Sequence, residues 1–295
     1  MNTLYYGDDL KILQDPIKDE CIRSAVTSMS ARIIFVVLLV LSTGCGRAGR
    51  TIPESEFPLR SVNVGGVTYN YRIYVPKEID PKQKPAVMLY LHGSNRRGSD
   101  NQAQLYDLYE SIKGFSQNWR FIVVVPQCRE NAFWAGPMMD QAIAALDQTV
   151  KEFGADPDRL YVAGYSMGGF GVWQTAITYP DKFAALVSIA GGVEPMGVVS
   201  AEDKALLSPQ AAAAASAPDT VRAYAEALHK LPVWVVHGSN DESVPVDQSR
   251  KLVNAFKAVG DPDVNYTELQ GVGHGSLIPA ITDPKLFEWL AKQHH

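Results

Sequence analysis

Short apolar runs that alternate with helical patterns constrain the fold of this chain most. These runs show little alternation of apolar and polar residues, and they lie at 86–91, 121–125, 160–163, 186–190 and 233–236. Such runs fit strands that are buried on both faces of a parallel sheet. Helical patterns lie between or after them, at 140–153, 168–179 and 249–259. The alternation predicts a mostly parallel, doubly wound α/β domain.

Two further patterns extend this domain at its ends. Runs rich in β-formers at 59–64 and 68–75 surround Gly65-Gly66, which predicts an N-terminal β-hairpin. Toward the C-terminus, 264–269 predicts a last strand and 284–292 a last helix. We expect the catalytic domain to extend over 58–295.

The segment 193–230 interrupts the alternation of strands and helices. It contains the alanine-rich stretches 211–215 and 220–228, which predict one or two helices. The segment is therefore expected to be a small helical insertion. Two interpretations stay open, a solvent-facing excursion and a partial lid beside the site.

The first 44 residues have the features of an export signal. Ile33–Leu41 is a run of nine apolar residues behind Arg32, too short to span a bilayer and suited to the apolar core of a signal peptide. Residues 1–28 carry several acidic groups, so translation from Met29 is an alternative start. The segment 45–57 is polar and predicts a tether.

Gly44-Cys45 ends a stretch of small residues that resembles a bacterial lipobox, although Ser42 stands where Leu is usual. The resemblance implies lipidation of Cys45 and a cell-envelope lipoprotein that meets the membrane only through its lipid. The alternatives are an ordinary secretory signal, which leads to a periplasmic or secreted protein, and an uncleaved anchor.

Charge and cysteine content exclude several functional classes. The net charge is -5, and no basic stripe indicates nucleic-acid binding. Three cysteines cannot form a disulfide framework. The sequence has no Cys/His spacing for a metal, no phosphate loop and no dinucleotide fingerprint, so we expect no metal and no cofactor. Nothing in the sequence predicts the oligomeric state.

Gly164-Tyr165-Ser166-Met167-Gly168 lies between a predicted strand and a predicted helix. A nucleophile raised on such a sharp turn has a strained backbone and needs small neighbours two residues away. The N-terminus of the helix also favours a developing oxyanion through its dipole. The pattern therefore predicts Ser166 as a catalytic nucleophile.

A serine nucleophile needs a base and a carboxylate that orients the base. Among the six histidines, His274 lies in a glycine-rich loop after the last predicted strand. His92 and His237 end strands and precede glycine, which is more typical of structural histidines. Asp241 follows the strand at 233–236 and is our candidate acid, with Glu242 and Asp247 as rivals. The order serine, aspartate, histidine is that of α/β-hydrolases.

The developing oxyanion needs two preorganised N–H donors. The residue after the nucleophile is Met167, and the loop after the strand at 86–91 offers Ser94. We expect the backbone N–H groups of these two residues to form the oxyanion hole. Further along that loop, Arg97 and Asn101 could touch a substrate carboxylate or sugar; alternatively, Asp100 and Asn101 cap the next helix. Two aromatic residues are also candidate substrate contacts, Tyr165 and Trp134; a core tryptophan is the alternative for Trp134.

Several stretches together resemble bacterial α/β-hydrolases that include feruloyl and acetyl-xylan esterases, polyhydroxybutyrate-depolymerase-like enzymes and proteins called predicted peptidases. The resemblance covers about residue 59 to the C-terminus, and the long segment 193–230 departs from it. The stretches that carry it are Leu91–Ser94, Arg97–Asn101, Val125–Cys128 with Trp134, Asp158–Trp173 and Pro232–Gly238 with Asp241 and Val244-Pro245.

The resemblance implies an α/β-hydrolase fold and hydrolysis of carboxylic esters, often of acyl groups on plant polysaccharides. The expected partner is thus a small-molecule or polysaccharide ester. A serine peptidase of the prolyl-oligopeptidase type is an alternative, since it shares the triad; those peptidases usually carry an added propeller domain. A third interpretation is a non-catalytic surface binding protein on a hydrolase fold.

Overall fold

The computed structural model describes residues 51–80, 82–193, 205–260 and 263–295. The chain divides into two units, Met1–Thr51 and Ile52–His295, and all elements described below belong to the second. The predicted signal region, the alternative start at Met29 and the predicted lipidation site at Cys45 lie outside the described residues. No helix among the described residues is long and apolar enough to cross a membrane.

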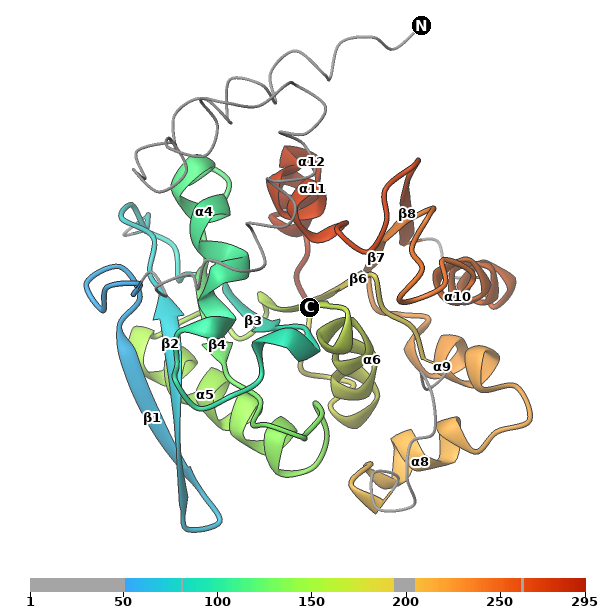
Figure 1. The fold of residues 1–295 in the computed structure, drawn as a ribbon, viewed down its shortest axis with the longest axis horizontal. Coiled ribbons are helices and arrows are strands. Elements are labelled where there is room, and N and C mark those ends of the chain that lie inside the picture. The colour runs from blue at the N-terminus through green and yellow to red at the C-terminus, as the bar shows by residue number, and fades with distance from the viewer. Residues whose placement is uncertain (1–50, 81, 194–204, 261–262) are drawn as a thin grey trace, which may run out of the picture. The chain divides into compact units, whose positions relative to one another are not determined.

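One eight-stranded sheet organises the second unit (Figure 1). Its strand order is β1-β2-β4-β3-β5-β6-β7-β8. β2 pairs antiparallel with β1 and β4, and all other neighbours are parallel. The strands are β1 (Leu59–Val64), β2 (Val67–Tyr74), β3 (Val87–Leu91), β4 (Ile122–Pro126), β5 (Leu160–Tyr165), β6 (Ala185–Ile189), β7 (Val233–Gly238) and β8 (Val264–Leu269). The predicted mostly parallel sheet with an N-terminal hairpin is confirmed, and Gly65 and Gly66 form the hairpin turn with positive φ angles.

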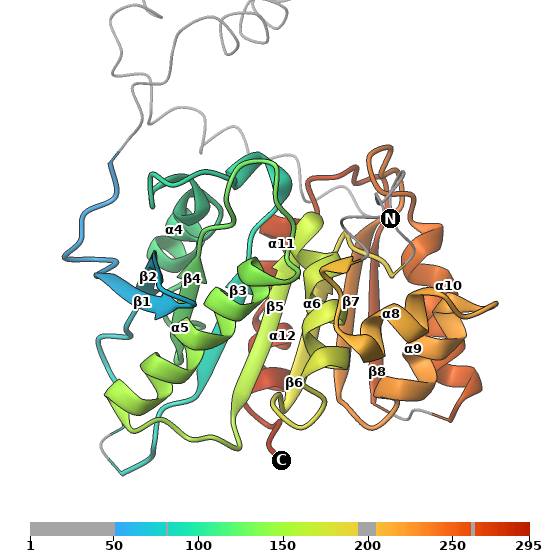
Figure 2. The ribbon, with the colours of Figure 1, turned by 90° about the horizontal axis from the view of Figure 1, so that it is seen from below.

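Helices cover both faces of this sheet (Figure 2). One layer consists of α5 (Pro137–Phe153), α6 (Met167–Thr178), α8 (Pro209–Ala215), α9 (Thr220–Leu228) and α10 (Asp247–Ala258). The other consists of α4 (Tyr106–Gly114), α11 (Leu277–Thr282) and α12 (Pro284–Leu290). Two short 3-10 helices, η1 (Ser94–Arg96) and η2 (Ala103–Leu105), follow β3. Among the α-helices, α4 and α11 were not predicted from the sequence.

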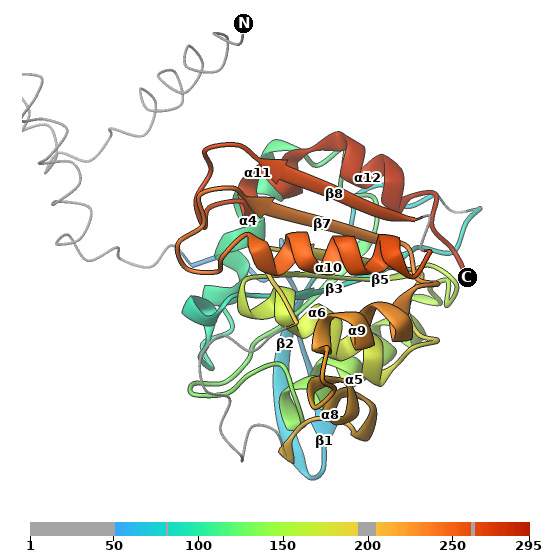
Figure 3. The ribbon, with the colours of Figure 1, turned by 90° about the vertical axis from the view of Figure 1, so that its right-hand side faces the viewer.

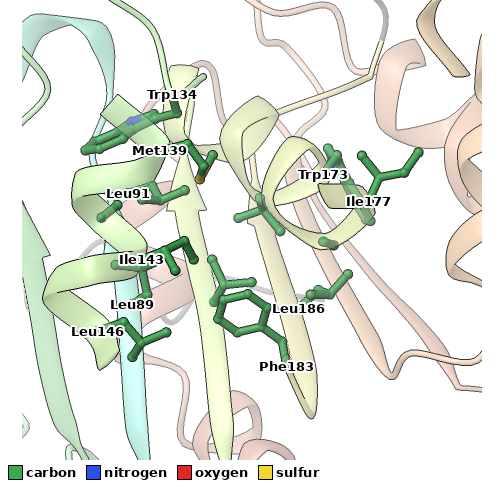
Figure 4. Packing of buried hydrophobic residues seen from close by; sticks show 14 of the residues in the cluster. Leu89, Leu91, Trp134, Met139, Ile143, Leu146, Trp173, Ile177, Phe183 and Leu186 are labelled. Carbon is green, nitrogen blue, oxygen red and sulfur yellow. The ribbon is translucent and has the colours of Figure 1, made fainter. Parts of the chain in front are cut away.

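The two layers explain why the strands lack polar alternation. In β3, Leu89 and Leu91 pack in the core under α5 and α6, whereas Met88 and Tyr90 pack in the core under α4 and α12. All residues of this strand are buried. Figure 4 shows the first core, where Leu89 and Leu91 lie beside α5. A strand covered on both faces has apolar residues at every position.

The parallel strands bring distant parts of the chain to one edge of the sheet. Carboxyl ends of parallel strands share an edge, and ligands bind there in open α/β sheets. β3 lies next to β5 in the middle of the sheet, and β7 and β8 lie side by side with α10 against them (Figure 3). The loops after β3, β5, β7 and β8 therefore carry the candidate site residues.

The predicted tether is shorter than expected. Ile52 and Phe57 are each 1% exposed, so the segment from Ile52 onward belongs to the folded unit. The buried Arg72 side chain donates from Nε to the Phe57 carbonyl and from Nη2 to the Ile52 carbonyl. The prediction of a tether to residue 57 was wrong for 52–57, because two apolar side chains within a polar stretch are enough to anchor it. In the rest of that segment, Thr51 is exposed, and 45–50 lie outside the described residues.

The described part of the insertion forms two helices that pack as part of a layer. α8 and α9 lie against α6 and each other, and α9 also contacts α10 (Figure 3). Tyr224 of α9 is fully buried and accepts a hydrogen bond from Gln174 of α6 at 2.6 Å. The predicted helices are confirmed, and they pack on the outer side of the helical layer, against α6 and α10. Residues 194–204 lie outside the described residues.

Candidate active site

Ser166 lies at the sharp junction where β5 ends and α6 begins. Its backbone has φ 54° and ψ -118°, a left-handed conformation that a residue with a side chain adopts only under constraint. A Cβ at Gly168 would lie 1.8 Å from the Leu91 carbonyl oxygen, and one at Gly164 would lie 2.2 Å from the Gly168 oxygen. The two glycines are thus required by close backbone packing, which holds the serine in place.

His274 links this serine to a carboxylate. Its Nε2 lies 2.9 Å from the Ser166 Oγ, and its Nδ1 lies 2.7 Å from the Asp241 Oδ2. A carboxylate only accepts, so Nδ1 carries the proton and Nε2 accepts from the serine hydroxyl. The structure therefore brings together the three residues that the sequence analysis selected from three separate loops.

The Asp241 side chain is fully buried. Its Oδ1 accepts from the backbone N–H groups of Ser243 at 2.9 Å and Val244 at 2.8 Å, while Oδ2 faces His274. These hydrogen bonds fix the orientation of the carboxylate toward His274. The two rivals lie elsewhere: Glu242 is exposed, and Asp247 pairs with Arg250 at 3.0 Å.

A second histidine touches the same carboxylate. His237 Nε2 lies 3.3 Å from the Asp241 Oδ2 and 2.9 Å from the Val244 carbonyl oxygen, and its Nδ1 lies 2.7 Å from the Ser249 Oγ. Burial lowers the pKa of His237, so the ring is neutral and Nε2 carries its proton. The sequence analysis missed this contact; the spacing of four residues between His237 and Asp241 is the only sequence signal for it.

Two backbone N–H groups beside Ser166 have no partner among the described residues. Met167 is the first residue of α6 and Ser94 the first of η1, and N–H groups at such positions have no intrahelical acceptor. A Cβ on Gly93 would lie 3.5 Å from the Ser166 Cβ, so the β3 loop lies directly against the serine. This arrangement is the one expected for an oxyanion hole.

His92 holds the β3 loop from within the core. Its Nδ1–H donates to the Gly93 carbonyl at 2.7 Å, and its Nε2 accepts from the Cys128 N–H at 2.9 Å. Both contacts require the neutral ring, and burial lowers the pKa of His92 to about 4. His92 is therefore structural, as its sequence context indicated.

Trp134 does not offer a surface for a sugar. It is 2% exposed, donates from Nε1 to the His92 carbonyl at 3.0 Å and packs edge-on against the His92 ring. The substrate-contact prediction for Trp134 was wrong, and the core alternative holds, because a large ring beside the β3 loop fills the space under α6. Its neighbour Phe133 is 47% exposed instead.

The other two predicted substrate contacts lie at the site. Tyr165 donates its hydroxyl to the His274 carbonyl at 2.6 Å, and its ring lies 5.2 Å from the imidazole. Burial raises the pKa of Tyr165 to about 12, so it stays a hydroxyl donor. Arg97 Nη2 lies 3.1 Å from the Met167 Sδ. Tyr165 therefore positions the His274 loop, and Arg97 lies beside the residue that follows the nucleophile.

The acidic residue of the Arg97 loop has a structural role. Asp100 Oδ1 accepts from the backbone N–H groups of Gln102 and Ala103, and from Gln127 Nε2 at 2.8 Å. Asn101 has φ 53° and donates its N–H to the Gln127 side chain. Asp100 thus caps the start of η2 as the capping alternative expects, whereas the Asn101 side chain bonds Ser99 and Gln104 and accepts from no backbone N–H of η2. Arg97 remains the candidate contact of this loop.

Other reactive groups lie away from the site. Within the described ranges, no group of three His, Cys, Asp or Glu side chains is placed to hold a metal. Cys128 is a buried free thiol, and burial raises its pKa to about 12. The site thus consists of a serine, two histidines, a carboxylate and backbone donors.

Known proteins share this chain's sequence and fold. Acetylxylan esterase A of Emericella nidulans is 26% identical over 155 residues, which are 48% of this chain and 47% of the relative. An uncharacterized secreted protein of Arthroderma benhamiae is 26% identical over 217 residues, 66% of this chain and 22% of the relative. The chain spans less than half the length of each of these relatives.

A solved structure of a thermostable esterase superposes with a TM-score of 0.66 at 26% identity, over 82% of this chain and 64% of that one. The model of the Prolyl oligopeptidase family matches residues 131–292, which include Ser166, Asp241 and His274. That match extends over more than half of the chain. The protein therefore belongs to the prolyl oligopeptidase family and has the α/β-hydrolase fold that its sequence predicts.

Proposed function

We propose that the protein is a serine hydrolase of carboxylic esters. The observation that carries this proposal is the chain of hydrogen bonds from the Ser166 Oγ through His274 to Asp241, on a strained turn beside two unpartnered N–H groups. A serine hydroxyl is a weak nucleophile until a base accepts its proton. Each part of the arrangement supplies one requirement of acyl transfer.

The reaction proceeds in two halves. The Ser166 Oγ attacks the ester carbonyl carbon while its proton moves to His274 Nε2, and the carbonyl oxygen becomes an oxyanion held by the N–H groups of Met167 and Ser94. The C–O bond to the alcohol then breaks, and the alcohol leaves with the proton from His274. Water next gives its proton to His274 and attacks the acyl-enzyme, which releases the acid and restores Ser166. Asp241 stabilises the imidazolium cation in both halves.

The proposed substrates carry short or aromatic acyl groups on a carbohydrate. Support comes from the relatives named as esterases, one of them an acetylxylan esterase. The family name favours a different substrate, since the prolyl oligopeptidase model covers the proposed triad. A serine peptidase is therefore the second candidate, because ester and amide carbonyls need the same catalytic groups. A non-catalytic binding protein is the third.

The test compares Ser166→Ala with Ser61→Ala, whose hydroxyl lies on the exposed side of β1. We expect a fluorophosphonate to label the wild type and Ser61→Ala but not Ser166→Ala. Ester hydrolysis should fall by about 10⁶ in kcat for Ser166→Ala only. Activity is measured on p-nitrophenyl acetate, methyl ferulate, acetylated xylan and a proline peptide anilide. Turnover of the anilide alone would favour the peptidase. If the fluorophosphonate labels neither the wild type nor Ser61→Ala, only the non-catalytic binding protein remains.

We also propose that residues 1–44 direct export and that lipid is attached to Cys45. The catalytic domain then extends from Ile52 to the C-terminus. Cys45→Ser should move the protein from the membrane pellet to the soluble fraction, because serine lacks the thiol that carries the lipid. The wild type should stay in the pellet if Cys45 carries the several acyl chains that durable anchoring needs. Equal distribution of the wild type and the variant would contradict lipidation, and export alone would then be tested by fractionation of the periplasm and medium.

A further inference from the structure

Arg97 lies at the rim of the site, between the two loops that carry the proposed oxyanion donors. It follows η1, three residues after Ser94, and its Nη2 lies 3.1 Å from the Met167 Sδ. Met167 directly follows Ser166 in the chain. The guanidinium therefore contacts the side chain of the residue that directly follows Ser166.

An aromatic ring holds the guanidinium in position. The Arg97 Cζ lies 4.7 Å from the centroid of the Phe133 ring, and Phe133 is 47% exposed. Arginine stacks well on aromatic faces because its cation is planar and weakly hydrated. This contact orients the guanidinium without using any of its N–H groups.

The guanidinium has no anionic partner among the residues that the structure describes. None of the carboxylates that the structure describes forms an ion pair with Arg97, and its buried Nε–H has no hydrogen-bond partner. The thioether of Met167 is only a weak acceptor. Arg97 as a whole is only partly buried, so a ligand oxygen would approach the exposed part of the guanidinium rather than the buried Nε.

The preceding residue shows what a structural arginine looks like in the same loop. Arg96 Nε donates to the Asp107 Oδ1 at 2.8 Å, and that carboxyl side chain is only 6% exposed. Glu130 is the nearest rival for Arg97, since its carboxylate lies close to Gly98, yet the structure has no ion pair between Glu130 and Arg97. Among the described residues, Arg96 thus has a carboxylate partner and Arg97 has none.

We propose that Arg97 is an anion-binding subsite and that the substrate is an ester bearing a carboxylate near the scissile carbonyl. The planar guanidinium suits a carboxylate because its parallel N–H groups match the two oxygens. The carboxylate belongs either to the acyl part or to the alcohol part of the ester. This inference rests on the proposed ester hydrolysis and adds the charge of the substrate to it.

The test uses two matched pairs of esters, followed by acid release at constant pH. Monoethyl glutarate against ethyl valerate tests a carboxylate on the acyl part, and acetoxyacetate against acetoxyacetamide tests one on the alcohol part. Each ester is assayed with the wild type, Arg97→Gln, Arg97→Lys, Glu130→Gln and Arg129→Gln. Arg129→Gln is the matched control because it removes the same charge. Arg129 is exposed and, like Arg97, lies over an aromatic ring, that of Tyr69.

We expect Arg97→Gln to lower kcat/KM about 10- to 100-fold for the anionic member of one pair, the size of one lost hydrogen bond to a charged group. The neutral member should change less than about threefold, and Arg97→Lys should recover part of the loss. Arg129→Gln should leave the preference unchanged. Equal effects of Arg97→Gln on both members would overturn the subsite while ester hydrolysis stands. A gain in anion preference with Glu130→Gln as large as the loss with Arg97→Gln would show that Glu130 is the partner instead. Absence of turnover and of fluorophosphonate labelling in the wild type would count against the proposed function itself.

Discussion

The same dipeptide stands at the carboxyl ends of two strands: His92-Gly93 directly follows β3, and His237-Gly238 are the last residues of β7. The two histidines have different contacts. Both imidazoles are fully buried, and burial lowers the pKa of both. His92 bonds only to backbone atoms and fixes the loop of Ser94. His237 instead reaches the carboxylate of Asp241.

The glycines of the two turns differ in the same way. A Cβ on Gly93 would meet side-chain atoms of Tyr165 and Ser166 at 3.3 and 3.5 Å. A Cβ on Gly238 would lie 2.2 Å from the backbone oxygen of Gly273, next to His274. The β3 turn thus leaves slight room against Ser166, whereas the β7 turn leaves none against the His274 loop. The same dipeptide therefore supports the loop of Ser94 after β3 and the loops of Asp241 and His274 beside β7, at the same edge of the sheet.

The largest effect expected from the loops of these two turns is that of Asp241, which we compare with its neighbour Asp247. Asp241→Asn should lower kcat for ester hydrolysis by about 10⁴, because an amide cannot hold the His274 tautomer. Asp247→Asn, which removes an exposed ion pair, should change kcat little. Steady-state kinetics on p-nitrophenyl acetate measures both. A silent Asp241→Asn with an inactive Asp247→Asn would reverse the assignment.

The next effect tests the two glycines directly. Gly238→Ala should lower kcat about 10²-fold, because its Cβ must displace the backbone beside His274 and a shift of about 1 Å in a reacting group has this effect. Gly93→Ala should have a smaller effect, since its neighbours need to move by only a few tenths of an ångström. Circular dichroism should show both variants folded. Equal losses would mean that the two turns are packed alike.

A third prediction concerns the pH dependence of stability through His92. Its folded pKa of about 4 lies below the unfolded value near 6.5, so the unfolded state binds more protons between these values. Stability is then complete above pH 6.5 and falls as the pH drops toward 4. Urea unfolding should show a free energy about 2 kcal/mol lower at pH 5 than at pH 7 from this group.

His92→Gln is the control for that experiment, since it keeps an acceptor for the Cys128 N–H and does not titrate. Its free energy of unfolding should lack this part of the pH dependence. Direct titration of the His92 ring by NMR gives a second measurement in the wild type. A ring that protonates near pH 6.5 would contradict the buried neutral state.

The smallest expected effect concerns His237. Removing its N–H with His237→Leu should lower kcat by about tenfold, because the polar contact of Nε2 with the buried Asp241 carboxylate at 3.3 Å is lost. His237→Gln, which keeps a donor toward Asp241 and Val244, should recover most of that loss. KM for p-nitrophenyl acetate should stay constant in both variants. A loss of thermal stability without any change in kcat would make His237 a structural residue like His92.

Much of this site was predictable from local pattern. Gly164-Tyr165-Ser166-Met167-Gly168 marks a strand-to-helix turn by steric need alone, and the order Ser166, Asp241, His274 narrows the partners to a few loop residues. The insertion was predictable as helices but not in its packing, since α8 and α9 have buried faces only because α6 and α10 lie beneath them. The helix α4 was not predicted for a similar reason. Its apolar face, which includes Leu108 and Ile112, can be recognised only once the residues of β3 and β4 that it covers are known.

The sequence by itself determined the fold class, the strained turn at Ser166 and the choice of Ser166 and His274 as the proposed nucleophile and base, because these depend on periodicity, on chain order and on steric demands within a few residues. Only the tertiary structure decided between equivalent local signals. It turned Trp134 inward, buried Ile52, and gave Arg96 a carboxylate partner while none of the described carboxylates pairs with Arg97. It also separated His92 from His237, which the chain presents in the same dipeptide. Those outcomes depend on which side chains distant segments bring together, and no short pattern in the chain contains that information.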